Sequence, residues 1–303
     1  MSVSGLSNSQ NTLFELSSSQ SAYSPARVAV LPVPYDGTAT YRKGSRAGPA
    51  AILEASQQVE DFDQDTGVLL SDIGIHLLNP VEPEADPVLM ADTVSVAASR
   101  IINDGKFLVT LGGDHAVATA GCCKAVKQRW NDVAAVVVDA HLDLRDEYQG
   151  SRFNHACTSR RLLDLDIPVL HLGVRSWSLE EEIFVRENSF SPITAEDIRS
   201  GKIGPAKITK RLPEQVYLSI DLDGLDPCVV PSVGTPEPGG LTWSFMVDFL
   251  AMLFEEKQVV AADIVELAPI HGDIRGDFTA ARLLAKLLSF KFRQLSRFPS
   301  LGD

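Results

Sequence analysis

The sequence has no long apolar run and few cysteines. No apolar stretch reaches the roughly 18 residues needed to span a bilayer, which predicts that the chain does not cross a membrane. No basic segment followed by an apolar one stands near Met1, so we expect no secretory signal and predict a cytoplasmic protein. The cysteines form no Cys-x-x-Cys pair, which argues against a zinc ribbon and favours buried, reduced thiols.

Basic residues are also in short supply. The chain carries 27 Lys and Arg against 40 Asp and Glu, a net charge of −13. Nucleic-acid binding needs basic patches to neutralise phosphates, so nucleic acid is not expected as a main partner. The acidity permits a cationic substrate without indicating one, because many soluble proteins are acidic simply for solubility.

The 303 residues are 45% hydrophobic and predict one domain behind a short tail. Residues 1–24 are rich in Ser and Gln and predict a flexible tail, with an arm docked by Leu13, Phe14 and Leu16 as the alternative. Residues 25–303 contain no composition break that would mark a linker and no repeat of 20 to 50 residues. We therefore predict a single catalytic domain over 25–303.

Short apolar strands alternate with helical segments along this domain. The expected strands are 27–35, 106–115, 134–141, 167–174, 215–223 and 258–269. The expected helices are 47–62, 87–105, 116–130, 157–165, 180–188, 243–256 and 276–292. Continuous apolar strands separated by helices predict an α/β fold with a parallel sheet that is covered on both faces.

Four of these strands end in clusters of ionisable residues. The clusters are Asp114 and His115; Asp139, His141 and Asp143; Asp221, Asp223 and Asp226; and Asp263 and Glu266. Sites in open parallel sheets lie beyond the carboxyl ends of the strands, so we expect these side chains to meet. One Asp at a strand end is usually a helix cap or a turn residue, and Asp226, before Pro227, fits a turn.

Several buried carboxylates facing one pocket repel each other and carry a desolvation cost of several kcal/mol each unless a cation neutralises them. Carboxylate oxygens and imidazole nitrogens suit Mn²⁺, Mg²⁺ or Fe²⁺ better than structural zinc. The number of ligands is about right for two metal ions that share carboxylates. The predicted ligands are His115, Asp139, His141, Asp143, Asp221 and Asp223.

A phosphatase interpretation competes with this one. The segment "YLSIDLDGLDP" is similar to the opening motif of haloacid-dehalogenase-like phosphatases, and "GDIRGD" imitates their later acidic motif. Only about fifty residues separate the two segments, too few for the elements that stand between them in that fold. The phosphatase interpretation also leaves the GGDH and DAHLD motifs without a purpose.

The segments "GGDHAVA", "DAHLD", "SIDLDGLDP", "PEPGGLTW" and "DIVELAP" resemble, in this order, the motifs of the ureohydrolase family of arginases and agmatinases. "PVPYDGTATYRKGSRAGPAAILEAS" and "LRDEYQGSRFNHA" resemble the agmatinase branch. The resemblance implies a three-layer α/β/α sandwich with a mainly parallel eight-stranded sheet. It also implies two Mn²⁺ per subunit held by the six predicted ligands, with Asp139 and Asp221 shared, and a trimer or hexamer.

The resemblance also assigns roles in catalysis. Glu266 matches the carboxylate that holds the guanidinium, and His155 matches a proton shuttle, so both are expected to contact the substrate. Asp223 is expected to pass a proton to the leaving amine. The implied reaction is hydrolysis of a guanidino compound to urea and an amine, with agmatine to putrescine as the favoured case. An inactive, ureohydrolase-like binding subunit is the non-enzyme alternative.

The loop after the DAHLD motif is expected to select the substrate. Arg145 would oppose an α-ammonium and so disfavours arginine, whereas Asp146 and Glu147 could attract the distal ammonium of agmatine. Arg145 or Arg152 could instead meet the carboxylate of 4-guanidinobutyrate, and free guanidine also stays open. Ala116 and Leu142 depart from the residues frequent in the family and could reshape the pocket.

Overall fold

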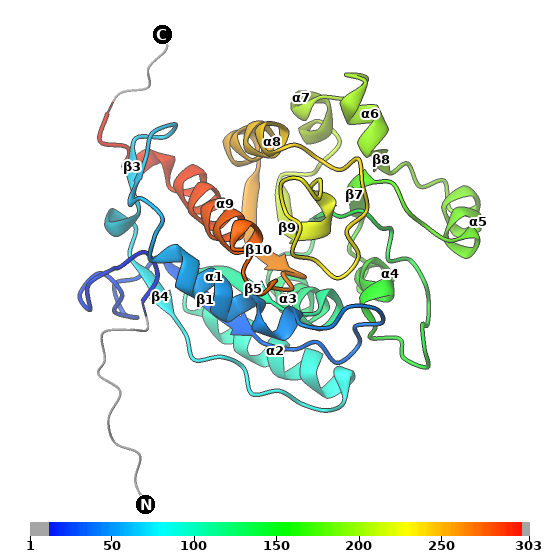
Figure 1. Ribbon diagram of the computed structural model, residues 1–303, viewed down its shortest axis with the longest axis horizontal. Helices are drawn as coiled ribbons and strands as arrows, with labels where there is room; N and C mark the ends of the chain where they lie inside the picture. The colour runs from blue at the N-terminus through cyan, green and yellow to red at the C-terminus, as the bar shows by residue number, and fades with distance from the viewer. Residues whose placement is uncertain (1–11, 299–303) are drawn as a thin grey trace, which may run out of the picture.

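The computed structural model describes residues 12–298, and one eight-stranded sheet runs through the middle of this part of the chain (Figure 1). The strand order is β4-β1-β5-β10-β9-β6-β7-β8, and every pairing in the sheet is parallel. The strands are β1 (Val28–Val33), β4 (Ile75–Leu77), β5 (Phe107–Gly112), β6 (Ala134–Val138), β7 (Val169–Val174), β8 (Ile193–Thr194), β9 (Gln215–Asp221) and β10 (Gln258–Val265).

The central strands are mainly apolar and almost wholly buried because both faces of the sheet are covered. In β1, Val28 and Val30 belong to one buried cluster, while Ala29 and Leu31 belong to another on the opposite face. Such two-sided burial is the reason that parallel strands show continuous apolar runs instead of alternation. The expected three-layer α/β/α sandwich with a mainly parallel eight-stranded sheet is confirmed.

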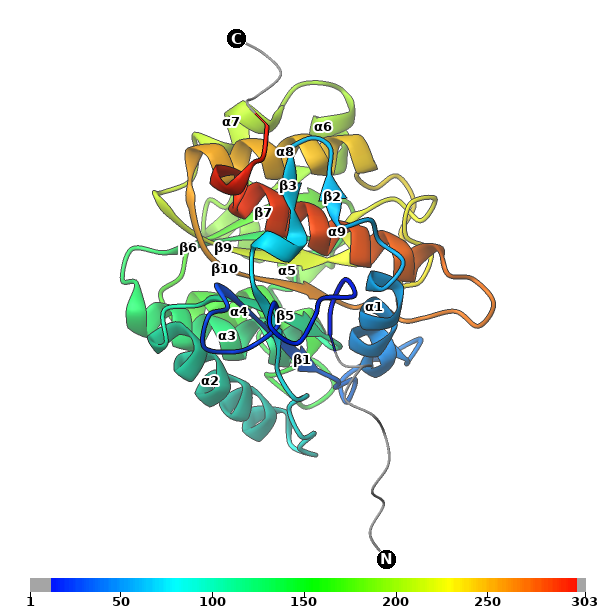
Figure 2. The same ribbon diagram turned by 90° about the vertical axis from the view of Figure 1, so that its left-hand side faces the viewer.

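Helices form the two outer layers, which Figure 2 shows above and below the sheet. One layer contains α1 (Gly48–Ser56), α8 (Trp243–Glu256) and α9 (Arg275–Lys291), with α7 (Pro205–Thr209) beside α8. The other contains α2 (Pro87–Asn103), α3 (His115–Arg129) and α4 (Thr158–Asp164). The segment between β7 and the short β8 forms α5 (Leu179–Glu187), and α6 (Ala195–Arg199) follows β8. Among residues 12–298, no helix combines the length and apolarity that crossing a membrane requires.

The structure adds elements that the sequence did not predict. Edge strands β4 and β8 have three and two residues, too few to show a hydrophobic pattern. The helix expected over 47–62 ends at Ser56, because the following residues turn into a hairpin of β2 (Phe62–Asp63) and β3 (Val68–Leu69). Tertiary pairing therefore overrides helix propensity at the end of this segment.

Part of the expected N-terminal tail lies against the body of the domain. The side chains of Leu13, Phe14 and Leu16 are buried in the core beside α1. The Gln57 side chain of the turn after α1 donates a hydrogen bond to the carbonyl of Thr12. The described residues thus have the arrangement of a docked arm, while residues 1–11 of the expected tail lie outside the described residues.

Candidate metal centre

The four polar strand ends of the sequence come together at one edge of the sheet. Strands β5, β10, β9 and β6 are consecutive neighbours and parallel, so their carboxyl ends lie side by side. All six residues predicted as metal ligands lie at this edge, within two groups of closely spaced side chains.

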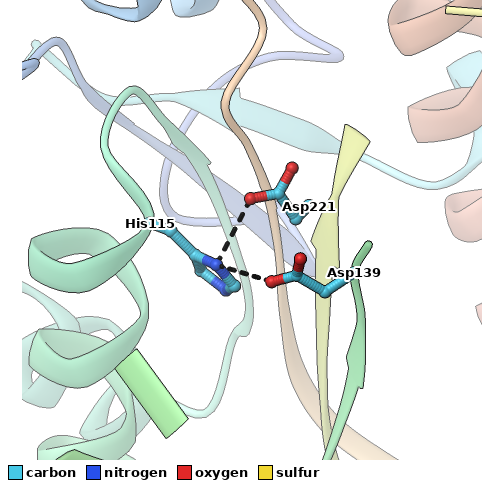
Figure 3. Close-up of side chains that lie close together, drawn as sticks. All are labelled: His115, Asp139 and Asp221. Atoms are coloured by element: carbon cyan, nitrogen blue, oxygen red, sulfur yellow. Dashed lines mark ion pairs between the residues drawn. The ribbon is translucent and has the colours of Figure 1, made fainter. Parts of the chain in front are cut away.

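The first group surrounds His115, the first residue of α3 (Figure 3). Its Nδ1 atom lies 3.3 Å from a carboxylate oxygen of each of Asp139, Asp143 and Asp221. His115 is fully buried and the three carboxylates are nearly so. One imidazole nitrogen therefore faces three acidic groups from the ends of two strands.

The second group lies next to the first and shares Asp139 with it. The Nδ1 atom of His141 lies 3.3 Å from Asp139 Oδ1 and 3.2 Å from Asp223 Oδ2. The two carboxylate oxygens of Asp139 thus point to different histidines, Oδ2 to His115 and Oδ1 to His141. This arrangement is that of a carboxylate bridging two neighbouring ion sites.

Local backbone geometry holds these carboxylates in place. The amide of His141 donates to Asp139 Oδ1 at 2.6 Å, and the amide of Asp223 donates to Asp221 Oδ1 at 2.9 Å. Gly224 follows Asp223 in a tight 3-10 turn, where an added Cβ would lie 2.8 Å from the backbone nitrogen of Asp139. The glycine of the Asp-x-Asp-Gly motif is therefore required because two strand-end loops touch at this point.

Burial and mutual repulsion dominate the charges of the two groups. Burial raises the pKa of Asp143 to about 7, with Asp139 adding to the rise. Burial also raises the pKa of Asp221 well above its usual range, with help from Asp223 and Asp139. Burial opposes protonation of His115, but its contacts with the carboxylates outweigh that effect and raise its pKa. Without a cation, the groups would have to hold protons to balance their charge.

The tautomer of His115 indicates what completes the site. Its Nε2 atom lies 3.0 Å from Ser219 Oγ, which itself donates to Asp263 Oδ1 at 2.7 Å. Nε2 must therefore carry a proton, so that in the neutral ring the Nδ1 lone pair faces three carboxylates. Within the described residues, His115 Nδ1 and Asp139 Oδ2 are buried atoms without a hydrogen-bond partner. A divalent cation satisfies both atoms, so the residues present fit a metal ion.

A buried hydrogen-bond network supports His115 from below. The Asp263 carboxylate in β10 accepts hydrogen bonds from Ser219, Thr119 and Tyr217. Ser219 lies two residues before Asp221 in β9, so both side chains project from the same face of the strand. In the sequence, this network is indicated by Ser219, a polar residue that stands two positions before a predicted ligand inside an otherwise apolar strand.

We predict that Asp263→Asn weakens metal binding without removing a ligand. The amide cannot accept all three hydroxyl hydrogen bonds, so Ser219 no longer orients the His115 ring. Apparent Mn²⁺ affinity, measured by titration of metal-free protein, should fall by roughly 10- to 100-fold. Thr119→Val, which removes one hydroxyl but keeps the link from Asp263 to His115, should change the affinity far less; an equal loss in both variants would contradict this role.

A cavity of about 330 Å³ opens above the two groups. Glu266 lines it from the end of β10, with a positive φ of 64° that is strained for a non-glycine residue. Its side chain accepts a hydrogen bond from the His115 amide at 2.7 Å, and its own amide donates to Gly113. Burial raises the pKa of Glu266 well above its usual range, and Asp114 adds to the rise, so a cation bound beside this carboxylate would relieve the cost of its charge.

His155 lies at the wall of the same cavity, as its predicted role requires. Its Nδ1 atom is 3.0 Å from the carbonyl of Thr38, so Nδ1 donates and Nε2 carries the lone pair. The Nε2 atom is 3.4 Å from the hydroxyl of Thr40, another lining residue. Burial lowers the pKa of His155, which keeps the ring neutral and able to accept a proton near neutral pH.

We predict that His155 controls the acidic limb of the rate profile. Because its pKa is lowered, the neutral form persists below pH 6.5, and activity should fall only when the ring becomes protonated at lower pH. His155→Asn should remove this limb and slow turnover by about 10²–10⁴-fold while bound metal stays unchanged. The checks are pH–rate profiles and metal analysis of both proteins; metal loss in the variant would contradict a proton-transfer role.

The loop after β6 matches the prediction only in part. Arg145 lines the cavity, but neither Asp146 nor Glu147 is among the lining residues in the described part of the chain. Asp146 is instead bound by Arg152 and Arg161, and Glu147 is exposed. The prediction that these two carboxylates bind substrate gains no support from this geometry, because one is held by arginines and the other is exposed outside the lining of the described chain.

The two departures from the family pattern do not reach the cavity. Leu142 is buried in a small apolar cluster with Leu144 and Val174, and none of the three is among the cavity-lining residues of the described chain. Ala116 is fully buried in the first turn of α3, where its amide bonds to Asp114. The expectation that these side chains reshape the pocket is not met, since neither contributes to its wall.

Other lining residues carry no motif and were missed. Glu181, at the N-terminus of α5, is nearly buried and accepts hydrogen bonds from the Leu144 amide and from Ser178. Thr235 lies 3.4 Å from Asp223 Oδ2. The capping box formed by Ser178 and Glu181 was detectable in the sequence, but it signals a helix start, and nothing in it indicates a cavity.

Comparisons with known proteins agree with this geometry. A family model described as "Arginase family" matches residues 26–289. The chain is 39% identical to the N(1)-aminopropylagmatine ureohydrolase of Synechocystis, over 89% of this chain and 90% of that protein. It is 36% identical to the agmatinase of Pyrococcus horikoshii, over 87% and 92%. The agmatine ureohydrolase of Thermoplasma volcanium has a similar structure, with a TM-score of 0.83, 34% identity, and 90% and 92% coverage.

Proposed function

The chain belongs to the arginase family, and from this premise we propose that it is a binuclear manganese hydrolase that cleaves a guanidino compound to urea and an amine. The observation that carries the proposal is the pair of histidine–carboxylate groups that share Asp139 below a cavity lined by Glu266. These are the parts that hydrolysis of a guanidinium requires: metal ligands and a buried carboxylate for the cationic substrate.

The donor atoms favour Mn²⁺ over structural zinc, because they are carboxylate oxygens and imidazole nitrogens without a thiolate. Two such ions supply a water molecule whose pKa is lowered from 15.7 toward about 7, and so hydroxide at neutral pH. The residues that would hold them are His115, Asp139, His141, Asp143, Asp221 and Asp223.

Three side chains would handle the substrate. Glu266 would form an ion pair with the guanidinium group of the substrate. This pair would orient the guanidinium carbon toward the metal centre. Asp223, which lines the cavity between His141 and Thr235, would take the proton of the attacking hydroxide and pass it to the leaving amine. His155 would carry to solvent, through the Nε2 side of its ring, the proton set free when the attacking water ionises.

We propose a linear guanidino amine as the substrate, agmatine or its N1-aminopropyl derivative. The relatives with these names support this choice, as does the Glu181 carboxylate in the cavity wall. Arg42 and Arg145 also line the cavity and favour 4-guanidinobutyrate as a second candidate, because its tail ends in a carboxylate.

The other interpretations lose their support. Membership of the arginase family excludes the haloacid-dehalogenase-like phosphatase. The segment that imitated a second phosphatase motif spans the end of the loop after β10 and the first turn of α9, where Asp273 pairs with Arg275 outside the cavity lining of the described chain. An inactive binding subunit would have no need for six intact ligand positions and Glu266. Oligomerisation to a trimer or hexamer, a cytoplasmic location and a role in polyamine synthesis stay predictions.

A panel assay tests the proposal. Urea release is measured after loading with Mn²⁺, using agmatine, N1-aminopropylagmatine, 4-guanidinobutyrate, arginine and guanidine. The proposal expects kcat/KM to be highest for one of the two guanidino amines. A preference for 4-guanidinobutyrate would move the assignment to the second candidate. If no compound releases urea although two metal ions are bound, the proposal that the protein is an enzyme is refuted.

A further inference from the structure

The loop that carries Arg145 into the cavity is folded as a small hairpin. Tyr148 and Ser151 exchange backbone hydrogen bonds across Gln149 and Gly150, which have φ values of 50° and 79°. Positive φ at both central residues is typical of a type I′ turn, the tight turn that matches strand twist. Tyr148 also lines the cavity, so the hairpin contributes two neighbouring side chains to the wall.

These two wall residues contact each other and the catalytic region. The Arg145 guanidinium lies over the Tyr148 ring, 4.7 Å from its centroid. The Tyr148 ring meets the His155 ring edge-on, with centroids 6.4 Å apart. Arg145 also approaches Glu180 at 3.8 Å, a long and exposed ion pair that is worth little. Little in these contacts alone would hold the hairpin in one position.

A buried arginine behind the hairpin does hold it. Arg161 in α4 is only 4% exposed, and its Nη1 atom donates to the carbonyls of Asp146 and Arg152, at 2.8 and 2.7 Å. These carbonyls belong to the two opposite arms of the hairpin. The Nη2 atom donates to Asp146 Oδ1 at 2.8 Å, and Nε lies 3.0 Å from Asp164 Oδ2. One planar guanidinium thus ties both arms to α4, which a lysine cannot do.

We propose that Arg161 and Asp146 are positioning residues that set substrate specificity by fixing the cavity wall formed by Arg145 and Tyr148. The inference rests on the proposed function, and it changes Asp146 from a substrate ligand into a clamp for the loop. The wall would contact the chain beyond the guanidino group, because the metal groups and Glu266 take up the other end of the cavity. Loosening the clamp therefore weakens binding of the tail while the reacting end stays in place.

The test compares a probe with a tail and a probe without one. Asp146→Asn removes the negative charge that pairs with Arg161. Arg161→Lys keeps the positive charge but removes the planar guanidinium that donates to both arms of the hairpin. The apparent affinity of agmatine, measured as KM or as inhibition constant, should weaken by roughly tenfold in both variants. The inhibition constant of methylguanidine and the bound Mn²⁺ should stay within about twofold of wild type. Asp92→Asn, which makes the same change as Asp146→Asn at a half-exposed residue of α2 paired with Lys124, should leave both probes unchanged.

The outcomes separate this inference from the proposed function. Equal weakening of agmatine and methylguanidine, or loss of Mn²⁺, would overturn the clamp as a specificity device, as would unchanged agmatine affinity in both folded variants. If Arg161→Lys does not fold, Asp146→Asn decides, because Asp146 is half-exposed and Arg161 keeps its pair with Asp164, so the charged tie to the hairpin is lost without leaving a buried charge unpaired. Absence of urea release from the wild-type protein would count against the proposed function instead.

Discussion

Asp139→Asn is expected to abolish metal binding and activity together. Asp139 is the carboxylate common to both groups, with one oxygen 3.3 Å from His115 Nδ1 and the other 3.3 Å from His141 Nδ1. An asparagine is neutral and offers one oxygen, so it cannot bridge two sites. Urea formation should fall by roughly 10³-fold or more, because the chemistry depends on water activated at neutral pH.

Metal analysis of the purified Asp139→Asn protein, with circular dichroism to verify the fold, checks this prediction. Asp92→Asn is the matched control, since it makes the same chemical change at a half-exposed residue whose ion-pair partner within the described part of the chain is Lys124 on the surface. It should retain full metal content and activity. Two bound Mn²⁺ ions and near wild-type turnover in Asp139→Asn would remove the basis for assigning the centre.

Glu266→Gln is expected to separate substrate binding from metal binding. Glutamine keeps the size of the side chain and an oxygen that can accept the His115 amide hydrogen bond. It loses the charge that pairs with a guanidinium in a buried place, where charge-assisted hydrogen bonds are strongest. We expect kcat/KM to fall by about 10²-fold or more, with both metal ions retained.

The measurement is steady-state kinetics with the best substrate of the panel, together with metal content. Glu182→Gln serves as control, because Glu182 lies one residue beyond the cavity-lining Glu181 and binds only the exposed Arg186 and the Trp177 indole among the described residues. It should show kinetics close to wild type. If Glu266→Gln instead loses metal, this carboxylate supports the structure of the metal centre. That result would contradict the assignment of Glu266 as the residue that binds the guanidinium group.

The candidate metal centre was predictable because its parts are local in sequence and governed by parallel-sheet geometry. Asp-x-His and Asp-x-Asp after apolar strands place both polar side chains at one strand end, and parallel pairing brings the ends together. Burying several carboxylates is costly unless a cation neutralises them, and this cost does not depend on the order of the strands in the sheet. Glu266 followed from the same rule, since β10 lies between β5 and β9.

The substrate loop was not predictable, because its charges have several partners available. Arg145, Asp146 and Arg152 are all charged residues in one short loop, and each could have faced the cavity. Only the fold places the buried Arg161 of α4 behind the hairpin, where it takes up Asp146 and both hairpin arms. The edge strands β4 and β8 were not predicted for a related reason. Segments this short form strands only because they pair with the backbone of a neighbouring strand.

By itself, the sequence therefore determined the layers of the fold, the six metal-ligand candidates and the chemistry that they imply. Strand-end spacing and the desolvation of carboxylates act over a few residues, and these effects are visible in the chain order. The tertiary structure alone decided which loop charges reach the cavity and which are neutralised by distant residues. That choice depends on contacts such as the one between α4 and the loop after β6, and no local pattern encodes them.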